Sequence, residues 1–223
     1  MSNKNVKLFV GMPSGQDIPI LTARSLMMWQ YKRKYPSLFE FKIDTYIEKA
    51  RNELVWQAVN EGATHLMMID SDMVFAPDAI DHLVDQEKDI IGGLYFGRMH
   101  PKSLAFHINP DGTVRNIDPK KETGIFEVDF VGTGFLLMNI NVFKTIDPPW
   151  FKFSYEPEAF GINPTGNVAP ALGEDAYFCL NAKKHGFKVW CDSTIELGHV
   201  GHHTYYREDH DAFMQNPKLY ERQ

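Results

Sequence analysis

The chain has 223 residues, of which 43% are hydrophobic and 23% are charged, and its formal net charge is −6 at pH 7. This composition predicts a globular protein with one main core and excludes disordered, collagen-like and coiled-coil chains. No apolar run reaches the ~18 residues of a membrane helix, the N-terminus lacks a signal-peptide pattern, and the acidic balance argues against a broadly basic nucleic-acid binder. The two cysteines, Cys179 and Cys191, form no zinc or disulfide pattern, which favours a cytoplasmic location.

The first half of the chain alternates short apolar runs with segments of helical periodicity. Strands are expected at residues 6–10, 39–46, 65–69 and 89–94, and helices at residues 20–35, 47–59 and 76–85. Residues 11–15, rich in glycine and proline, are expected to form a loop, and Gly62 is expected to cap a helix. This order predicts an α/β fold: a single-domain, three-layer α/β/α sandwich with a mostly parallel central sheet.

The second half has a different pattern, which predicts a small antiparallel part. A hairpin is expected at residues 103–108 and 113–117, further strands at 126–131, 135–139 and 187–191, and a helix at 172–185 closed by Gly186. The irregular stretch 148–170 is typical of a lid or an acceptor-binding loop. Its aromatic residues either stack on a ligand or pack the loop; they are Trp150, Phe151, Phe153, Tyr155 and Phe160.

The strongest chemical motif is Asp70-Ser71-Asp72, directly after the buried strand expected at residues 65–69. Ligands of open α/β sheets bind at the carboxyl ends of strands, and two carboxylates at positions i and i+2 there can converge on one divalent cation. Oxygen ligands suit Mg²⁺ or Mn²⁺, which commonly also hold substrate phosphates. The alternative is that these aspartates only begin the next helix.

Two further motifs carry groups able to titrate or bind metal. Gly173-Glu174-Asp175 opens the helix expected at 172–185; one carboxylate there can act as a general base, although acidic residues also favour a helix N-terminus through the helix dipole. The sequence Gly198-His199-Val200-Gly201-His202-His203 follows a strand-like run at 193–197, and its imidazoles are potential ligands for Mn²⁺ or Zn²⁺.

Two weaker motifs have competing interpretations. Arg51 and Asn52 begin a helix, where an arginine can meet a diphosphate or a base or can simply be exposed. Gly132-Thr133-Gly134 lies between two apolar strands and either lets a substrate approach the backbone or forms a bulge.

Taken in order, these motifs resemble the GT-A glycosyltransferases, in particular the family-2-like enzymes that use nucleotide-diphospho-sugars. The resemblance spans roughly residues 5 to 205 and rests on the motifs above together with Gly62-to-Met73 and Asp89-to-Tyr95. It implies a catalytic domain at residues 1–206, with a nucleotide-sugar-binding half at about 1–98 and an acceptor half at about 99–206. Residues 207–223 are then expected to form a C-terminal tail.

The resemblance implies a role for each matching position. Asp70, Asp72 and His199 would hold Mn²⁺ or Mg²⁺ on the donor diphosphate, and Asp175, or less plausibly Glu174, would be the catalytic base. The remaining donor-binding positions are Pro13, Ser14, Arg51, Asn52, Ser71, Gly132, Thr133 and Gly134. The expected activity is a hexosyltransferase-like transfer from a UDP- or GDP-sugar to a hydroxyl of a glycan, a lipid, a protein or a modified DNA base.

Two other functions are compatible with the same residues. A metal-dependent hydrolase would use Asp70, Asp72, His199 and His202 to bind zinc or two metal ions and activate water. A non-catalytic sugar-nucleotide-binding protein would keep the fold without turnover.

Overall fold

The computed structural model describes residues 5–44, 46–98, 101–160, 162, 172–201 and 204–216, which form a mixed α/β fold. The helices are α1 (Ile20–Lys32), α2 (Ile47–Asn60), α3 (Ala79–Asp85), α4 (Ile140–Thr145), the short 3₁₀ helix η1 (Pro157–Phe160), α5 (Glu174–Lys184) and α6 (Arg207–Gln215). The strands are β1 (Leu8–Ser14), β2 (Ser37–Ile43), β3 (His65–Ile69), β4 (Met73–Phe75), β5 (Ile90–Gly93), β6 (Ala105–Ile108), β7 (Val114–Asn116), β8 (Ile125–Val128), β9 (Phe130–Val131), β10 (Phe135–Asn139), β11 (Val189–Asp192), β12 (Leu197–Val200) and β13 (Thr204–Tyr205).

The main sheet has seven strands in the order β2-β1-β3-β10-β5-β11-β8. Strands β1, β2, β3, β5 and β11 run in one direction, whereas β10 and β8 run in the other. The sheet is therefore mostly parallel, as expected, but one antiparallel strand, β10, lies near its centre, between β3 and β5. Two smaller sheets of three strands, β13-β12-β4 and β7-β6-β9, complete the described fold.

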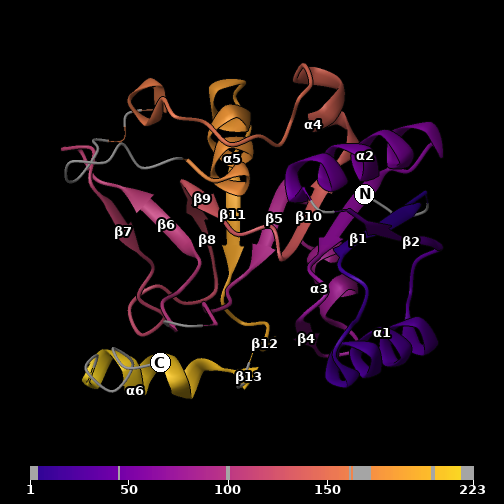
Figure 1. Cartoon of the computed structure of the whole chain (residues 1–223), viewed down its shortest axis with the longest axis horizontal. Helices are drawn as coiled ribbons and strands as arrows, with labels where there is room; N and C mark the ends of the chain where they lie inside the picture. Colours follow the sequence, from indigo (N-terminus) through magenta and orange to yellow (C-terminus); the bar gives the residue numbers. More distant parts are fainter. Residues whose placement is uncertain are drawn as a thin grey trace.

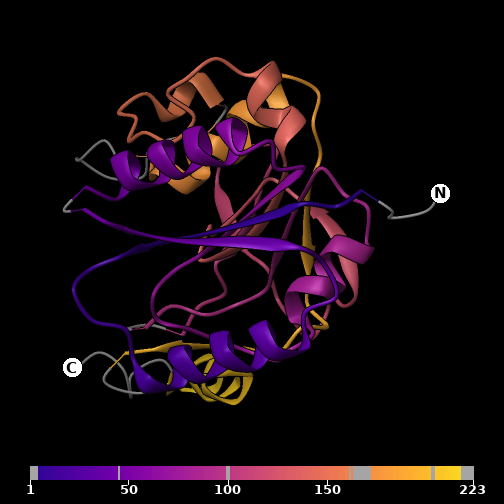
Figure 2. The same ribbon diagram turned by 90° about the vertical axis from the view of Figure 1, so that its right-hand side faces the viewer.

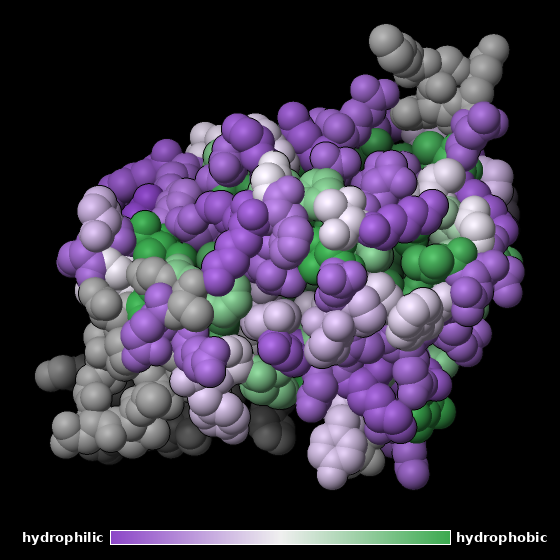
Figure 3. Space-filling model, turned by 90° about the horizontal axis from the view of Figure 1, so that it is seen from above, coloured by the Kyte–Doolittle hydropathy of each residue, from purple (hydrophilic) through white to green (hydrophobic). Residues whose placement is uncertain are grey.

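Helices lie on both sides of the main sheet. Figure 1 shows α2, α4 and α5 above the strands and α1 and α6 below them, and the turned view of Figure 2 separates the same two helical layers. Seen from above, the face formed by the upper helices is largely hydrophilic, with small hydrophobic patches between the polar side chains (Figure 3).

The core is divided into two clusters by the main sheet, and β3 contributes to both. Leu66 and Met68 belong to one cluster, and Met67 and Ile69 belong to the other. Successive residues of a strand point to opposite faces, and both faces of β3 are covered, so all four side chains are buried. This explains the continuous apolar run and confirms the prediction of a strand buried on both faces.

The end of β1 differs from the sequence prediction. Residues 11–14 were expected to form a loop, but the strand continues through Ser14. Pairing with β3 ends at Gly11, and beyond it only the register with β2 continues, with Pro13 opposite Lys42. Pro13 is tolerated because a proline at this place needs no ladder partner on the β3 side.

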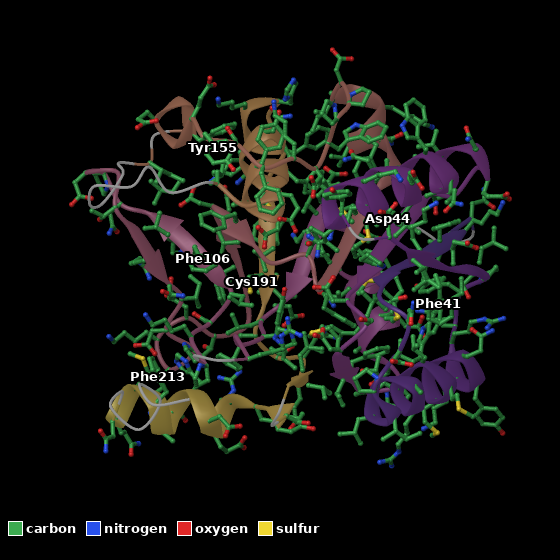
Figure 4. All side chains as sticks on the ribbon, viewed as in Figure 1. Phe41, Asp44, Phe106, Tyr155, Cys191 and Phe213 are labelled. Atoms are coloured by element: carbon green, nitrogen blue, oxygen red, sulfur yellow. The ribbon has the colours of Figure 1, made fainter. Side chains whose placement is uncertain are left out.

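The segment expected to form a C-terminal tail begins with a helix that the sequence analysis did not predict, because residues 207–215 form α6. His210 and Phe213, three residues apart on this helix, are buried. Phe213 lies on the side of α6 that faces the rest of the molecule (Figure 4), and His210 stacks on Phe96. Residues 217–223 lie outside the described part. In the described residues, no helix combines the length and apolar character needed to span a membrane, and both cysteines are buried free thiols.

Candidate functional site

A cavity of about 440 Å³ lies where β1 and β3 end at their carboxyl termini. Its volume is within the range of ~300–1,000 Å³ that is usual for small-molecule sites. The predicted site residues that line it are Pro13, Ser14, Arg51, Asp70, Ser71, Asp72, Glu174, Asp175 and His199. Segments separated by more than a hundred residues of sequence thus meet at one edge of the sheet.

Arg51 connects two of the acidic positions. Its Nη2 donates to Oδ1 of Asp70 at 2.9 Å, and its Nη1 donates to Oε1 of Glu174. The arginine side chain is only 4% exposed, because α2 carries it on the face that packs against the sheet. The alternative that Arg51 is an exposed helix residue is therefore wrong. Its charge is balanced by two carboxylates that line the cavity.

Asp72 and His199 form the second polar group. Oδ1 of Asp72 lies 3.4 Å from Nε2 of His199. The two backbones are held together because β12 pairs with β4, and the N–H of Val200 donates to the carbonyl of Asp72 at 2.8 Å. His199 therefore lies within a strand of a small sheet, not after a strand at 193–197 as the sequence analysis expected.

The Asp72–His199 pair has the chemistry of a cation site. Nδ1 of His199 donates to the carbonyl of Phe96 at 2.8 Å, so in the neutral ring Nε2 has the lone pair and faces the carboxylate. A histidine that binds metal commonly has this type of partner on its other nitrogen. Two ligand atoms that bind a cation at right angles with bonds of about 2.1 Å lie about 3 Å from each other. The distance between Oδ1 of Asp72 and Nε2 of His199, 3.4 Å, is close to this value.

The arrangement is not a preformed three-ligand centre. In the part of the chain that the structure describes, no group of three His, Cys, Asp or Glu side chains is placed to hold one ion. Asp70, the third expected ligand, is paired with Arg51, and Asp72 also accepts a bond of 2.6 Å from Arg98. Asp72 and His199 therefore fit a cation that takes its other ligands from substrate or water, which is common for Mg²⁺.

The electrostatic environments of the carboxylates differ. Burial would raise the pKa of Asp72, but the hydrogen bond and the charge that His199 supplies when it is protonated, together with the charge of Arg98, lower it below its ordinary value. For Asp175, burial raises the pKa; the positive charge of Arg51 and the N–H of Ala176 only partly oppose that effect. Burial also raises the pKa of Glu174, against the charge of Arg51. The site thus has an acid that favours ionisation beside acids that resist it.

Asn52 does not line this cavity, although it is the neighbour of Arg51 in the sequence. Its side-chain oxygen accepts from the N–H groups of Trp150 and Phe151, at 2.9 and 3.2 Å. Its amide donates to the carbonyls of Phe151 and Glu48, both at 2.7 Å. Neighbouring helix residues point in directions about 100° apart, so Arg51 faces the site while Asn52 holds the segment after α4.

Gly132, Thr133 and Gly134 do not line the cavity either, and the two glycines accommodate the buried ring of Tyr95. A Cβ atom at Gly134 would lie 2.7 Å from the Tyr95 hydroxyl oxygen, and a Cβ at Gly132 would clash with the same atom. The N–H of Gly134 donates to that oxygen at 3.0 Å, and the carbonyl of Gly134 accepts from the N–H of Asp70 at 2.9 Å. These glycines therefore make room for Tyr95, and Gly134 also bonds the backbone of Asp70, without lining the cavity.

Sequence reasoning missed three polar cavity residues: Asp44, Tyr95 and Arg98. Asp44, labelled in Figure 4, follows β2, and Tyr95 and Arg98 follow β5. The available signal was their position after strands that run parallel to β3, because the carboxyl ends of such strands share one edge of the sheet.

The aromatic residues of the irregular stretch do not line this cavity. Trp150 and Phe151 are buried in the core, whereas Phe153 and Tyr155 are exposed. His202 and His203, and residues 161 and 163–170 of that stretch, lie outside the described residues.

Comparison with known proteins shows the fold and no more. No family model matches the chain, and no curated protein matches its sequence. The chain is similar to the crystal structure of A197 from STIV, with a TM-score of 0.59 and 16% sequence identity, over 88% of this chain and 86% of that one. At this identity, the similarity concerns the arrangement of helices and strands alone.

Proposed function

We propose that the protein is a metal-dependent glycosyltransferase of the GT-A type, which moves a sugar from a nucleotide-diphospho-sugar to an acceptor hydroxyl. One observation carries the proposal: a candidate cation pair, Asp72 and His199, shares a cavity with a half-buried candidate base, Asp175. A UDP- or GDP-sugar is the proposed donor. Pro13 and Ser14, at the end of β1, lie on the wall of this cavity, where the nucleotide would contact them.

In this proposal, Asp72 and His199 hold Mn²⁺ or Mg²⁺ against the donor diphosphate. A bound divalent cation supplies Lewis-acid stabilisation of the negative charge that grows on the leaving phosphate oxygens. Asp70 and Ser71 lie beside this position, and Arg51 fixes the carboxylate of Asp70 through their 2.9 Å bond.

Asp175 is the proposed general base. Its carboxylate takes the proton of the acceptor hydroxyl while that oxygen bonds to the anomeric carbon and the nucleoside diphosphate leaves with the bonding electrons. Asp175 is preferred to Glu174 because the Glu174 carboxylate is already engaged by the guanidinium of Arg51, whereas the Asp175 carboxylate accepts from the backbone N–H of Ala176. A raised pKa suits Asp175 to this role, since it strengthens the carboxylate as a proton acceptor.

The test is thermal unfolding with UDP, GDP, CDP and dTDP, each with and without Mn²⁺. A ligand at 100 times its dissociation constant adds about 2.7 kcal/mol to native-state stability, which is about 5–10 °C for a domain of this size. We expect this shift only with a nucleotide and Mn²⁺ together, and its loss in Asp72→Asn. Asp78→Asn, an exposed aspartate at the start of α3 that does not line the cavity, is the matched control.

A sugar-transfer assay with Asp175→Asn completes the test. This variant should keep the nucleotide-dependent shift and lose transfer. A response to zinc alone, with phosphoester cleavage in the absence of a sugar donor, would instead identify a hydrolase. Binding of nucleotide by the wild type without transfer or donor hydrolysis would identify a non-catalytic sugar-nucleotide-binding protein.

A further inference from the structure

Arg98 lies at the opening of the cavity, on a loop that follows β5. A backbone bridge between Phe96 and Ser103 and a 3.0 Å bond from the Gly97 N–H to the carbonyl of Lys102 fix the base of this loop. Nη1 of Arg98 donates to Oδ2 of Asp72 at 2.6 Å. The arginine side chain is 55% exposed, whereas that of Asp72 is 16% exposed, so Arg98 approaches the carboxylate from the solvent side.

The two arginines of the cavity are held in different ways. The carboxylates that line it are those of Asp44, Asp70, Asp72, Glu174 and Asp175. Arg51 is buried and bonded to two of them, from α2 to β3 and α5, so its guanidinium cannot turn without breaking the packing. Arg98 is held at one carboxylate and is largely in solvent, where an ion pair is weak. Of these two cations, Arg98 is the one that can move.

Arg98 and a divalent cation would compete for the same group. Arg98 binds Oδ2 of Asp72, and Oδ1 of the same carboxylate faces His199. A cation held by Asp72 and His199 would repel the guanidinium and withdraw negative charge from its acceptor. A diphosphate bound to that cation would offer the guanidinium new acceptors, since the planar guanidinium matches phosphate oxygens with paired hydrogen bonds.

We propose that Arg98 is a diphosphate-binding residue that rests on Asp72 in the free protein and moves to the donor diphosphate when a cation binds Asp72 and His199. This inference rests on the proposed function and adds to it a selectivity for nucleoside diphosphates over monophosphates. The proposal predicts two opposite effects of substituting Arg98 on ligand binding. Removing Arg98 removes a competitor of the cation and also removes a ligand of the diphosphate.

The experiment is isothermal titration calorimetry on the wild type, Arg98→Ala and Arg98→Lys. Each is titrated with Mn²⁺ alone, and then with UDP, GDP, UMP and GMP at saturating Mn²⁺. The control is Arg115→Ala, since Arg115 is also exposed and ion-paired, with Glu122 at 2.9 Å, but does not line the cavity. Circular dichroism of each variant checks that the fold is retained.

For Arg98→Ala we expect Mn²⁺ alone to bind about 1.5-fold to fivefold more tightly, because a weak surface ion pair no longer opposes it. The preferred diphosphate should bind at least about tenfold more weakly, as for the loss of a charged hydrogen bond, and its monophosphate should change less. The affinities of Arg98→Lys should lie between those of the wild type and those of Arg98→Ala. The affinities of Arg115→Ala should match those of the wild type.

Two results would overturn the inference while leaving the proposed function in place. If Arg98→Ala weakens Mn²⁺ and diphosphate together, Arg98 only orients Asp72. If neither affinity changes in a wild type that binds both ligands, Arg98 has no role in binding. A wild type that binds neither Mn²⁺ nor any nucleotide would overturn the proposed function and this inference with it.

Discussion

Arg51 of α2 and Asp70, the residue after β3, are joined by a 2.9 Å ion pair inside the cavity. The other terminal nitrogen of the same guanidinium bonds Glu174 at the start of α5. One buried cation therefore links three segments of the chain that carry the candidate site. The pair serves the fold and the site together, because the charges that it balances belong to cavity residues.

The first prediction concerns the loss of this cation. Arg51→Met keeps an unbranched side chain but leaves Asp70 and Glu174 without their shared counter-ion. Removing one partner of a buried ion pair typically costs about 3–5 kcal/mol, so the midpoint of urea unfolding should fall sharply. Arg51→Lys keeps the charge but cannot bond both carboxylates in a fork, and should recover part of the loss. A loss below about 1 kcal/mol for Arg51→Met would contradict the structural role given to the pair.

The second prediction separates Asn52 from its neighbour. Asn52→Ala leaves the N–H groups of Trp150 and Phe151 without their acceptor, which should reduce the free energy of unfolding by about 1–3 kcal/mol. Nucleotide affinity measured with Mn²⁺ should remain that of the wild type. Asn52→Asp keeps the acceptor and loses the donor to the carbonyls of Phe151 and Glu48, so its stability should be intermediate. Weaker nucleotide binding by a stable Asn52→Ala protein would return Asn52 to the site.

These two adjacent residues show what the sequence can predict. The periodicity of α2 and the apolar run of β3 predict both elements, and the position of Asp70 and Asp72 after β3 predicts that they face a site. The resemblance grouped Arg51 and Asn52 because they are neighbours in sequence. Their separation depends on the rotation of α2 against the sheet, which is set by packing against β1 and β3 and not by the motif itself.

In the second half of the chain, long-range strand pairing limits what the sequence can predict. The strand at 135–139 was predicted, but its antiparallel insertion between β3 and β5 depends on pairing across more than forty residues. Helix α6 was missed because its sequence is polar and only a small face, with His210 and Phe213, is buried. His199 reaches Asp72 only because β12 pairs with the three-residue strand β4, which is too short for a periodic signal.

The third prediction tests the support that Tyr95 and Gly134 give to Asp70. A Cβ at Gly134 would lie 2.7 Å from the Tyr95 hydroxyl and 3.1 Å from Oδ2 of Asp70. Gly134→Ala should therefore cost about 1–3 kcal/mol by overpacking. Tyr95→Phe removes the hydroxyl that accepts from Gly134 and should cost about 1 kcal/mol alone.

The double variant provides the decisive comparison. With the hydroxyl gone, the added methyl group has more room, so Gly134→Ala with Tyr95→Phe should cost at least about 0.5 kcal/mol less than the sum of the single changes. Urea unfolding of the four proteins measures this coupling. Strict additivity would show that the glycine does not act through Tyr95.

The fourth prediction is that Asp175 lowers stability at neutral pH while serving catalysis. Burial raises its folded-state pKa above the ordinary value of 3.8, so the folded protein holds this proton more tightly than the unfolded chain does. The ionised form therefore destabilises the fold, and this cost grows as the pH rises from the unfolded pKa through the folded one. Asp175→Asn should accordingly raise the melting temperature at pH 7–8, with the gain disappearing as the pH falls to about 4, near the unfolded-state value.

The rate of catalysis should depend on pH in the opposite direction to stability, because both depend on the proton of Asp175. Because the base must be ionised, the rate of sugar transfer should fall as the pH decreases through a pKa higher than that of an ordinary aspartate. Melting curves and transfer rates of both proteins across this pH range measure the two effects. A stabilised Asp175→Asn protein that retained transfer would remove Asp175 from the role of base, whereas a destabilised and inactive one would show that the carboxylate is needed for the fold. Only stabilisation together with loss of transfer fits a half-buried charge that is retained for its chemistry.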